Sequence, residues 1–385
     1  MSNFLHPVSL QSFLSEYWEK QPLHIERQDS TAEPLLDMPS IETLLSMQPL
    51  YFPGVQLTQS GRAIDVATYA DEENRVLPLR LFDEHAKGAT IVLSQAHKLF
   101  PSLAQLCREA TRTLQMRAQA NVYISPPGNQ GFNAHYDTHD VFILQVSGTK
   151  TFNFYPSSVE LPCPDEQFDA SKLNASNIDE SVVLHAGDTL YIPRGIVHDA
   201  VADGKTPSLH VTLGVYTTIV RDVLQEVIQH ICEQDIELRR SVNDSTAWPD
   251  IAERLKNELE NGHLVSQVLS RMQDDVALDA QQDCMGLAHR RSLASDDNGV
   301  AVTFKSVRLR PDLIISHEMD SNARLKVRTF GQVLEFEEPL SALVEQLLVT
   351  HRLSESDLAK MDGTQRQALV SCLLQENLIE ADWLT

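Results

Sequence analysis

The stretch from Gly131 to Pro156 constrains this chain more than any other, because it combines a strand pattern with residue types that bind metals. Within it, His135 and Asp137 stand two residues apart and lead into the apolar run 141–144, whose residue types favour strands. Successive side chains of a strand point to opposite faces, so residues two apart point the same way. The spacing therefore predicts that this imidazole and this carboxylate face one metal ion.

A third ligand has to come from a distant part of the chain. His198 follows a turn-rich strand that ends at residues 193–195. Two neutral imidazoles and one carboxylate on a single face of a metal are the ligand set of non-haem Fe(II) oxygenases, which keep adjacent positions open. A His-x-Asp pair alone usually binds nothing, and a single histidine is most often a hydrogen-bonded structural residue. The conjunction of the pair, the later histidine and the turn at Gly187-Asp188 favours a metal site.

Lys150 strengthens this interpretation. It follows Gly148-Thr149 and opens the strand-like run 151–155. A lysine that enters an otherwise apolar sheet interior is unfavourable unless it meets an anion. An anionic cosubstrate would supply that negative charge.

Together these residues resemble the JmjC-type, or cupin-4, 2-oxoglutarate oxygenases, and most closely their ribosomal-oxygenase branch. The resemblance rests on H-Y-D at 135–137, V-F-I-L-Q at 141–145 and G-x-K at 148–150, with further likeness at 13–25 and 208–214. It implies that Fe(II) is bound by His135, Asp137 and His198, and that 2-oxoglutarate is bound by Lys150 and Tyr123. Lys150 would pair with the distal carboxylate, and Tyr123 would be the family's active-site tyrosine.

The resemblance also implies the fold of the first part of the chain. It is expected to be a mainly β catalytic domain, a double-stranded β-helix of cupin and JmjC type, inside a helical coat. Strand patterns at 121–125, 141–146, 151–155, 181–184, 189–192 and 209–215 agree with a sandwich or barrel. Helical spacing predicts helices at 9–18, 41–47 and 103–114, and short strands are expected at 51–52, 55–57 and 90–93. Segment 157–179 is expected to be a surface loop or a lid.

Two further histidines of this region, His185 and His210, are expected to be satisfied neutral residues without a direct role. Two departures from the family concern the substrate. Phe152 stands where relatives often carry tryptophan, and His139-Asp140 replaces a stretch that varies among members. Neither change touches the predicted metal ligands, so the substrate is the open question.

Beyond residue 218 the pattern becomes helical, with apolar stripes at 220–231, 250–259 and 264–272. Relatives use such a segment for homodimerisation, whereas packing within one chain is the alternative. After an expected linker at 285–298, strands at 300–310 and 324–336 and helices at 340–350, 355–361 and 364–375 resemble a winged-helix module. The predicted domains are therefore 1–218, catalytic; 219–290, an α-helical dimerisation segment; and 291–385, a winged-helix-like α+β domain.

The acidic balance of the chain bears on its partners. A net charge of −23 at pH 7 argues against binding to nucleic acid or to an anionic membrane, although it also serves solubility. The last domain carries an acidic cluster at 335–338, so it is expected to contact protein and not DNA. Five scattered cysteines without C-x-x-C spacing, and no signal peptide or membrane-length apolar run, predict a cytoplasmic protein.

The sequence thus predicts an Fe(II)- and 2-oxoglutarate-dependent dioxygenase that hydroxylates an amino-acid side chain of a protein. The resemblance implies a basic ribosomal protein as substrate. A hydroxylase of a small molecule or of a non-ribosomal peptide would share the iron site. A non-catalytic metal-binding cupin that acts as a regulator or binding module is the other alternative, but it would not need Lys150.

Overall fold

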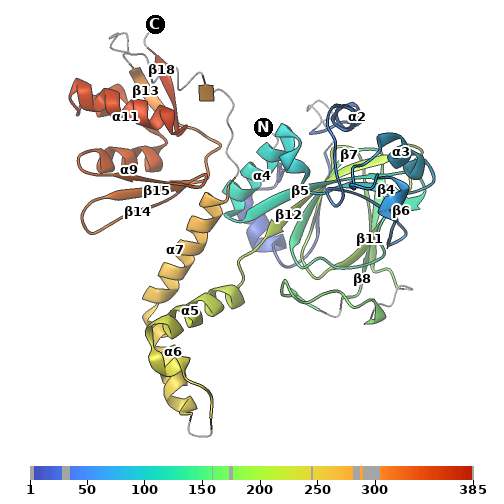
Figure 1. Ribbon diagram of the computed structural model, residues 1–385, viewed down its shortest axis with the longest axis horizontal. Helices are drawn as coiled ribbons and strands as arrows, with labels where there is room; N and C mark the ends of the chain where they lie inside the picture. The colour runs from blue at the N-terminus through green and yellow to red at the C-terminus, as the bar shows by residue number, and fades with distance from the viewer. Residues whose placement is uncertain are drawn as a thin grey trace. The chain divides into compact units, whose positions relative to one another are not determined.

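The computed structural model describes residues 4–27, 35–157, 159–172, 177–243, 246–280, 287–288 and 304–383. The chain divides into two compact units, 1–217 and 218–385 (Figure 1). The further predicted boundary at residue 290 stays a prediction, and the linker predicted at 285–298 lies outside the described residues apart from 287–288. No helix in the described ranges combines the length and the apolar character needed to cross a membrane.

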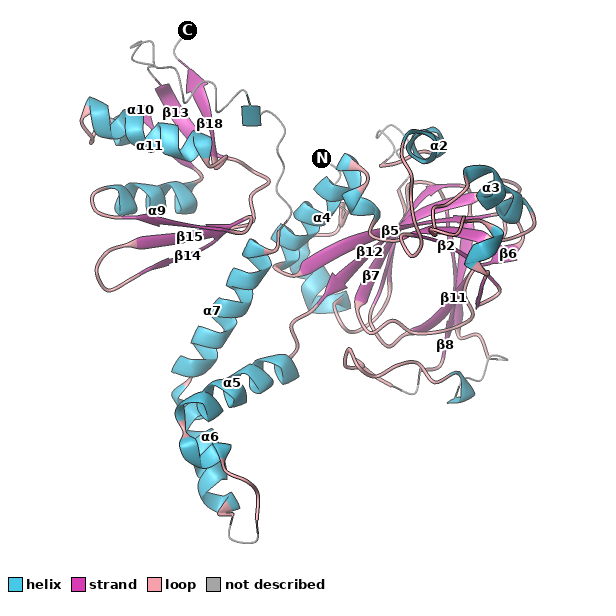
Figure 2. Cartoon of the chain, in the orientation of Figure 1, coloured by secondary structure: helices cyan, strands magenta, loops and turns pink. Residues whose placement is uncertain are grey.

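The first unit is built around two antiparallel sheets (Figures 1 and 2). Within the described residues, the larger sheet consists of β1 (Leu23–Ile25), β2 (Val55–Gln59), β3 (Arg62–Ala63), β4 (Thr90–Leu93), β5 (Arg117–Ser125), β7 (Asp140–Ser147), β10 (Thr189–Ile192) and β12 (Ser208–Tyr216). The smaller sheet consists of β6 (Asn129–Gln130), β8 (Lys150–Tyr155), β9 (Glu180–Leu184) and β11 (Val197–Ala202). Their spatial orders are β1-β10-β7-β12-β5-β4-β2-β3 and β6-β11-β8-β9.

The two sheets pack face to face, because alternate side chains of their strands meet. Ile143 of β7 and Ile192 of β10 share one buried cluster with Phe152 and Phe154 of β8. Phe142, which directly precedes Ile143, points to the opposite face of the sheet, into the larger core beneath the helices. This arrangement confirms the predicted β-helix of two facing sheets with a helical coat.

The helical coat covers the outer face of the larger sheet. It includes α1 (Leu10–Ser12), η1 (a π-helix, Phe13–Tyr17), α2 (Met38–Met47), α3 (Pro78–Ala86), η3 (Ala96–Lys98) and α4 (Pro101–Leu114). Helix α4 begins with proline in its first turn and buries apolar residues at helical spacing, including Leu103, Leu106 and Ala110. The predicted helix at 9–18 is a short α-turn followed by a π-turn, and α3 was not predicted.

Most predicted strands of the first unit are present with slightly longer bounds. Strand β11 was not predicted: His198 follows β10, as expected, but it lies inside a further strand that pairs with β8. Residues 51–52 form no strand, and Tyr51 makes only an isolated bridge with Arg75. The placement of His198 within a strand matters because the alternation of β11 sends its imidazole to the inner face.

The second unit begins with helices and ends with mixed α and β structure. Its helices are α5 (Val220–Gln234), η5 (Ile236–Arg239), α6 (Trp248–Asn261), α7 (His263–Leu278), α9 (Leu340–Thr350), α10 (Glu355–Leu358) and α11 (Gly363–Gln375). Its described strands form two sheets, one of β13 (Phe304–Leu309), β17 (Arg352–Ser354) and β18 (Ile379–Trp383) and one of β14 (Ser316–Met319), β15 (Leu325–Thr329) and β16 (Gln332–Phe336). The run 324–336, predicted as strand, is a hairpin that turns at Phe330-Gly331, and both residues have positive φ.

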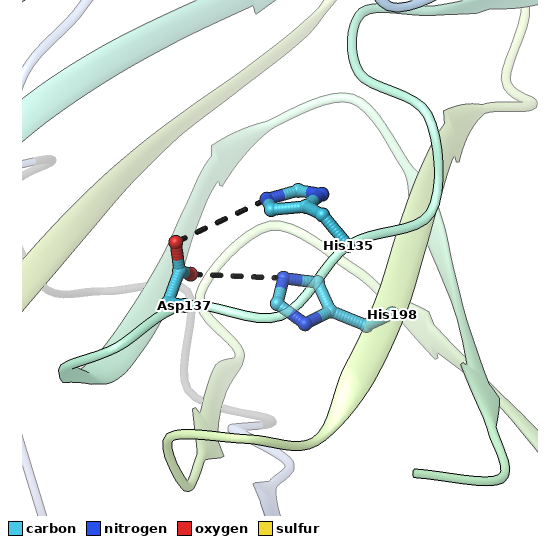
Figure 3. Close-up of side chains that lie close together, drawn as sticks. All are labelled: His135, Asp137 and His198. Atoms are coloured by element: carbon cyan, nitrogen blue, oxygen red, sulfur yellow. Dashed lines mark ion pairs between the residues drawn. The ribbon is translucent and has the colours of Figure 1, made fainter. Parts of the chain in front are cut away.

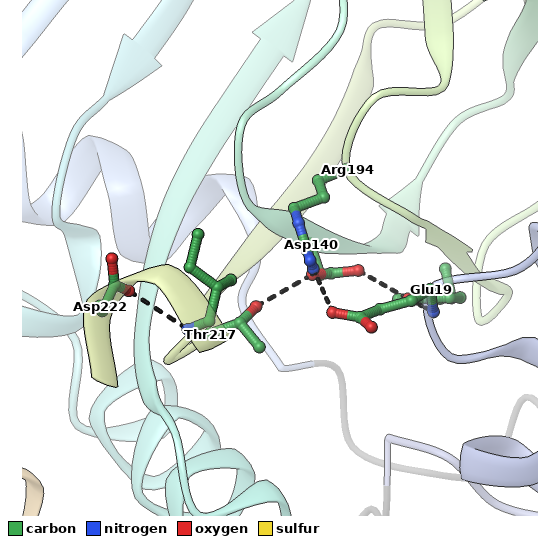
Figure 4. A network of polar contacts seen from close by, with 7 residues as sticks. Glu19, Asp140, Arg194, Thr217 and Asp222 are labelled. Carbon is green, nitrogen blue, oxygen red and sulfur yellow. Dashed lines mark hydrogen bonds and ion pairs between the residues drawn. The ribbon is translucent and has the colours of Figure 1, made fainter. Parts of the chain in front are cut away.

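A buried ionic network lies at the start of β7 (Figure 4). The Asp140 carboxylate, 0% exposed, accepts hydrogen bonds from Tyr191 Oη at 2.6 Å, Arg194 Nη1 at 3.1 Å and Thr217 Oγ1 at 3.2 Å. Arg194 also pairs with Glu19. The network joins the segment that follows Asp137 to the turn that precedes His198, so it fixes both chain segments that carry predicted ligands.

Candidate metal centre and its chamber

The structure brings the three predicted ligands together (Figure 3). His135 and His198 form an isolated antiparallel bridge, in which each backbone N–H donates to the other's carbonyl at 3.0 and 2.7 Å. Asp137 lies two residues on, and its carbonyl accepts from the Gly195 N–H at 3.0 Å. One ligand atom from each side chain lies within 4.8 Å of the others. These backbone contacts hold both histidines and the aspartate at one end of the region between the inner faces of the two sheets, which we call the chamber.

The hydrogen bonds of the two imidazoles fix which nitrogen is free. His135 Nδ1 lies 2.8 Å from the Asn133 carbonyl oxygen, and His198 Nδ1 lies 3.0 Å from that of Ile196. A carbonyl oxygen can only accept, so each Nδ1 carries the proton and each Nε2 presents a lone pair. The two Nε2 atoms face the Asp137 carboxylate at 4.0 and 3.9 Å. Two neutral imidazoles and one carboxylate therefore fit a divalent metal such as Fe(II).

Burial keeps the metal-facing imidazole of His198 neutral. Its pKa is lowered, first because burial disfavours the charged form and second because a charge on the neighbouring His135 would repel a charge on His198. Asp137 remains 28% exposed, so the open side of the cluster is reached from solvent. The centre thus has a buried back, formed by β11, and an accessible front.

The predicted cosubstrate lysine lies deeper in the chamber. Lys150, the first residue of β8, is 4% exposed, and its Nζ donates to Ser125 Oγ on β5 at 3.1 Å. Burial lowers the pKa of Lys150 to about 7. Among the described residues, no carboxylate forms an ion pair with Lys150. A buried ammonium that meets only a hydroxyl is unfavourable, so this place fits an incoming anion.

Tyr123 makes ring contacts toward both the lysine and the candidate metal ligands. Its ring stacks on His210 of β12 at 4.9 Å and meets the edge of Phe132 at 5.9 Å, and Phe132 in turn lies 6.0 Å from His135. Burial raises the pKa of Tyr123, and the charge of Asp137 adds to this rise. The predicted cosubstrate tyrosine therefore faces the same chamber as the metal cluster.

Sequence reasoning did not consider Ser125, and it expected His210 to be a satisfied histidine, whereas His210 Nδ1 has no hydrogen-bond partner among the described residues. Strand alternation could have placed both side chains on the inner face. Ser125 follows Tyr123 by two residues and so shares its face. His210 sits between Leu209 and Val211, which pack in the outer core, so it points inward. His185 is exposed and stays outside the ligand cluster. Its backbone N–H donates to Asp188.

Residues 166–168 of the loop pack against the segment that carries two of the candidate ligands. The Tyr136 hydroxyl lies 3.2 and 3.3 Å from the carbonyl oxygens of Glu166 and Gln167, and its ring meets the edge of Phe168. The side chain that points away from the metal cluster thus holds the loop. The described part of the loop is a packed element of the site's outer wall.

The comparisons with known proteins agree with this geometry. Residues 93–223 match the family model described as the JmjC domain. The bifunctional lysine-specific demethylase and histidyl-hydroxylase NO66 of Drosophila persimilis is 28% identical over 255 residues, which are 63% of this chain and 36% of that protein. The chain therefore spans about a third of the length of that curated relative.

Two solved structures share the fold over nearly the whole chain. The Escherichia coli ribosomal oxygenase YcfD aligns with a TM-score of 0.56 and 14% identity, covering 97% of this chain and 98% of that one. YcfD in complex with cobalt and 2-oxoglutarate aligns with a TM-score of 0.54 and 12% identity at the same coverage. At these identities the likeness concerns the fold.

Proposed function

Because residues 93–223 are a JmjC domain, we propose that this chain is an Fe(II)- and 2-oxoglutarate-dependent oxygenase that hydroxylates a side chain of a protein. One observation carries the proposal: two imidazole lone pairs and a carboxylate converge in a chamber whose buried lysine has no anionic partner among the described residues. A cupin that only stores a metal would gain nothing from that lysine. The names of the relatives, a histidyl-hydroxylase and a ribosomal oxygenase, point the same way.

The residues of the site have distinct proposed roles. His135, Asp137 and His198 would hold the iron, and their backbone and Nδ1 hydrogen bonds set their orientation before the metal arrives. Lys150 and Tyr123 would bind 2-oxoglutarate, with the lysine on the distal carboxylate. The chemistry that iron, 2-oxoglutarate and dioxygen supply together is the insertion of oxygen into a C–H bond. The protein would hold the reactants in position, and apolar side chains that include Phe152 and Phe154 line the chamber.

The substrate class follows from charge and from relatives. The net charge of −23 favours a basic partner, and the structural relative YcfD is a ribosomal oxygenase by name. We therefore propose a basic ribosomal protein as substrate. Incubation of the protein with ribosomes, Fe(II) and 2-oxoglutarate should add the mass of one oxygen atom to one ribosomal peptide. Oxidation confined to other extract components would favour the small-molecule or non-ribosomal alternative.

A simple assay separates catalysis from mere metal binding. The wild-type protein should release succinate from 2-oxoglutarate when Fe(II) is supplied and should lose this activity when a chelator removes the metal. Absence of iron-dependent turnover in every extract tried would contradict the proposal. The chain would then be better described as a metal-binding regulator.

Replacing Lys150 with methionine should weaken binding of 2-oxoglutarate. The lost charge-assisted hydrogen bond corresponds to about 1.5–3 kcal/mol, or roughly ten- to over a hundredfold in affinity. Calorimetry on the Mn(II)-loaded protein without dioxygen measures this directly. Lys98→Met, at an exposed lysine of η3, is the matched control and should change nothing. Equal affinities of Lys150→Met and wild type would exclude the assigned role.

The same lysine predicts a pH dependence. With a pKa of about 7, the free Lys150 loses its proton above neutral pH, and the neutral amine attracts the dianion less. The affinity of the wild-type protein for 2-oxoglutarate should therefore fall as the pH rises from 7 to 9. Lys150→Met should show a flatter profile over this range. A wild-type affinity that rises with pH would contradict the prediction.

The helical segment of the second unit is proposed to form a homodimer. On α5, Val220, Leu224 and Ile228 stand four residues apart on one face and remain 75%, 37% and 45% exposed, while Val227 and Ile231 pack inward. A continuous exposed apolar stripe on a helix suits a second copy of that helix.

The acidic cluster Glu335, Glu337 and Glu338 supports a protein-contact role for the last part of the chain, and not DNA binding.

Charge placed on this stripe should dissociate the dimer. Leu224→Asp combined with Ile228→Asp is expected to shift the protein from dimer to monomer, because two carboxylates would be buried at the interface. Size-exclusion chromatography with light scattering reports the mass. Val333→Asp, at an exposed position of β16, is the control and should remain dimeric. A monomeric wild-type protein would refute the proposal.

A further inference from the structure

His210 occupies a place that neither the metal centre nor the lysine contact explains. It lies on β12, opposite Tyr123 of β5 and Gln145 of β7 in the register. Its neighbours Leu209 and Val211 pack in the outer core, so the imidazole points to the inner face. The residue is 4% exposed, and its Nδ1 has no hydrogen-bond partner in the described part of the chain. Buried polar atoms are normally paired, so this one marks a place for a ligand.

The surroundings of His210 form a polar corner in an otherwise apolar interior. Lys150 is close enough for its charge to act on the imidazole, and Ser125 receives the lysine hydrogen bond. Gln145 Oε1 is also buried without a partner among the described residues, but as an acceptor it suits a donor and not an anion. On the other side the corner is bounded by Phe152, whose ring meets His210 edge-on at 6.2 Å. Hydrogen-bond donors and the Lys150 ammonium thus lie close together, and no carboxylate of the described residues forms an ion pair with that ammonium.

Resting on the proposed function, we infer that His210 is a second donor to the distal carboxylate of the cosubstrate. One imidazole N–H would hydrogen-bond the carboxylate that Lys150 attracts, so the corner selects a 2-oxo dicarboxylic acid over a 2-oxo monocarboxylic acid of the same length. The imidazole is suited to this role because burial, and then the charge of Lys150, lower its pKa and keep it neutral. A neutral imidazole still has one N–H to donate and does not repel the ammonium.

A purely structural role gives a different expectation. His210 stacks on Tyr123 with an interplanar angle of 5°, so its removal disturbs a ring that faces both ends of the chamber. Such damage would weaken every ligand of the chamber to a similar degree. Loss of a carboxylate contact would instead weaken only ligands that carry the distal carboxylate. The ratio of two affinities therefore separates the two roles.

The experiment compares 2-oxoglutarate with 2-oxopentanoate, which has the same chain length and no distal carboxylate. Both are titrated into the full-length, Mn(II)-loaded protein without dioxygen, and binding is followed by solvent-proton relaxation. His210→Leu removes the N–H, and His210→Gln keeps a donor. His97→Gln, at a half-buried histidine of the helical coat whose Nδ1 accepts the Ala120 N–H, is the control for loss of a hydrogen-bonded imidazole outside the site. Thermal unfolding checks that each variant folds.

The expected result is a roughly ten- to hundredfold loss of 2-oxoglutarate affinity in His210→Leu, with 2-oxopentanoate affinity unchanged and part of the loss recovered in His210→Gln. The His97→Gln protein should match wild type for both acids. Equal losses for both acids, or no loss, would overturn the assignment of His210. A wild-type protein that binds Mn(II) but neither acid would overturn the proposed function, and this inference with it.

Discussion

Replacing His198 with alanine is expected to abolish stable binding of Fe(II), and with it all iron-dependent release of succinate. Loss of a residue that only orients a metal ligand lowers affinity or activity by about 10–100-fold, so loss of a ligand should cost more than about a hundredfold. The remaining pair, His135 and Asp137, would leave the metal held from one chain segment. Metal content after gel filtration and Mn(II) titration followed by electron paramagnetic resonance both measure the effect.

The chain offers a matched control for this substitution. His85 also directs its Nδ1 to a backbone carbonyl, that of Ala89 at 2.8 Å, but it lies outside the ligand cluster. His85→Ala should keep full metal affinity and differ from wild type only modestly in stability. Full iron-dependent activity in His198→Ala, or equal metal loss in both variants, would show that the three converging side chains are not the metal site.

Replacing Asp140 with alanine is expected to lower the free energy of unfolding by about 3–5 kcal/mol, because it leaves the buried Arg194 guanidinium without this partner. Both side chains are nearly inaccessible, at 0% and 7% exposure, so water cannot replace the lost contact. Urea unfolding followed by circular dichroism measures the change. The metal affinity should fall as well, since the network fixes the turn before His198.

An exposed ion pair sets the scale for this effect. Asp71 pairs with Arg75 at 2.8 Å at the surface, and Asp71→Ala should cost less than about 1–2 kcal/mol, including its backbone hydrogen bond. Replacing Asp140 and Arg194 together by leucine and methionine should restore part of the stability, because no buried charge is then left unpaired. Equal costs for Asp140→Ala and Asp71→Ala would mean that the buried network contributes no more than a surface pair.

Local patterns predicted much of the first unit. The run of strand-favouring residues at 141–146 and the turn residues between strands predicted the sheets, and the resemblance to the JmjC family is confirmed by the match at 93–223. The convergence of His198 with the pair was also expected, and the structure places these side chains together. Their roles as ligands, and those of Lys150 and Tyr123, stay predictions.

The missed features depend on contacts between distant residues. Strand β11 includes the polar Asp199, which argues against a buried strand until its partners appear: Asn153 and Tyr155 of β8 and Gln130 of β6 donate to its carboxylate. Helix α3 has Leu81 as its single buried residue, so its apolar stripe is too short to detect. The pairing of strands brings such partners together, and the sequence around a single strand does not reveal that pairing.

The position of Tyr136 between two metal-facing residues has a thermodynamic consequence. Residues 135–137 present the candidate ligands on one side and hold residues 166–168 of the loop on the other, so a metal bound there and whatever contacts the loop would act on a shared backbone segment. If the loop's packing changes the affinity for the metal by some factor, then metal occupancy must change the loop's preference for its packed position by the same factor. A protein that contacts the loop and strengthens metal binding would in turn be bound more tightly by the metal-loaded protein, by the same factor.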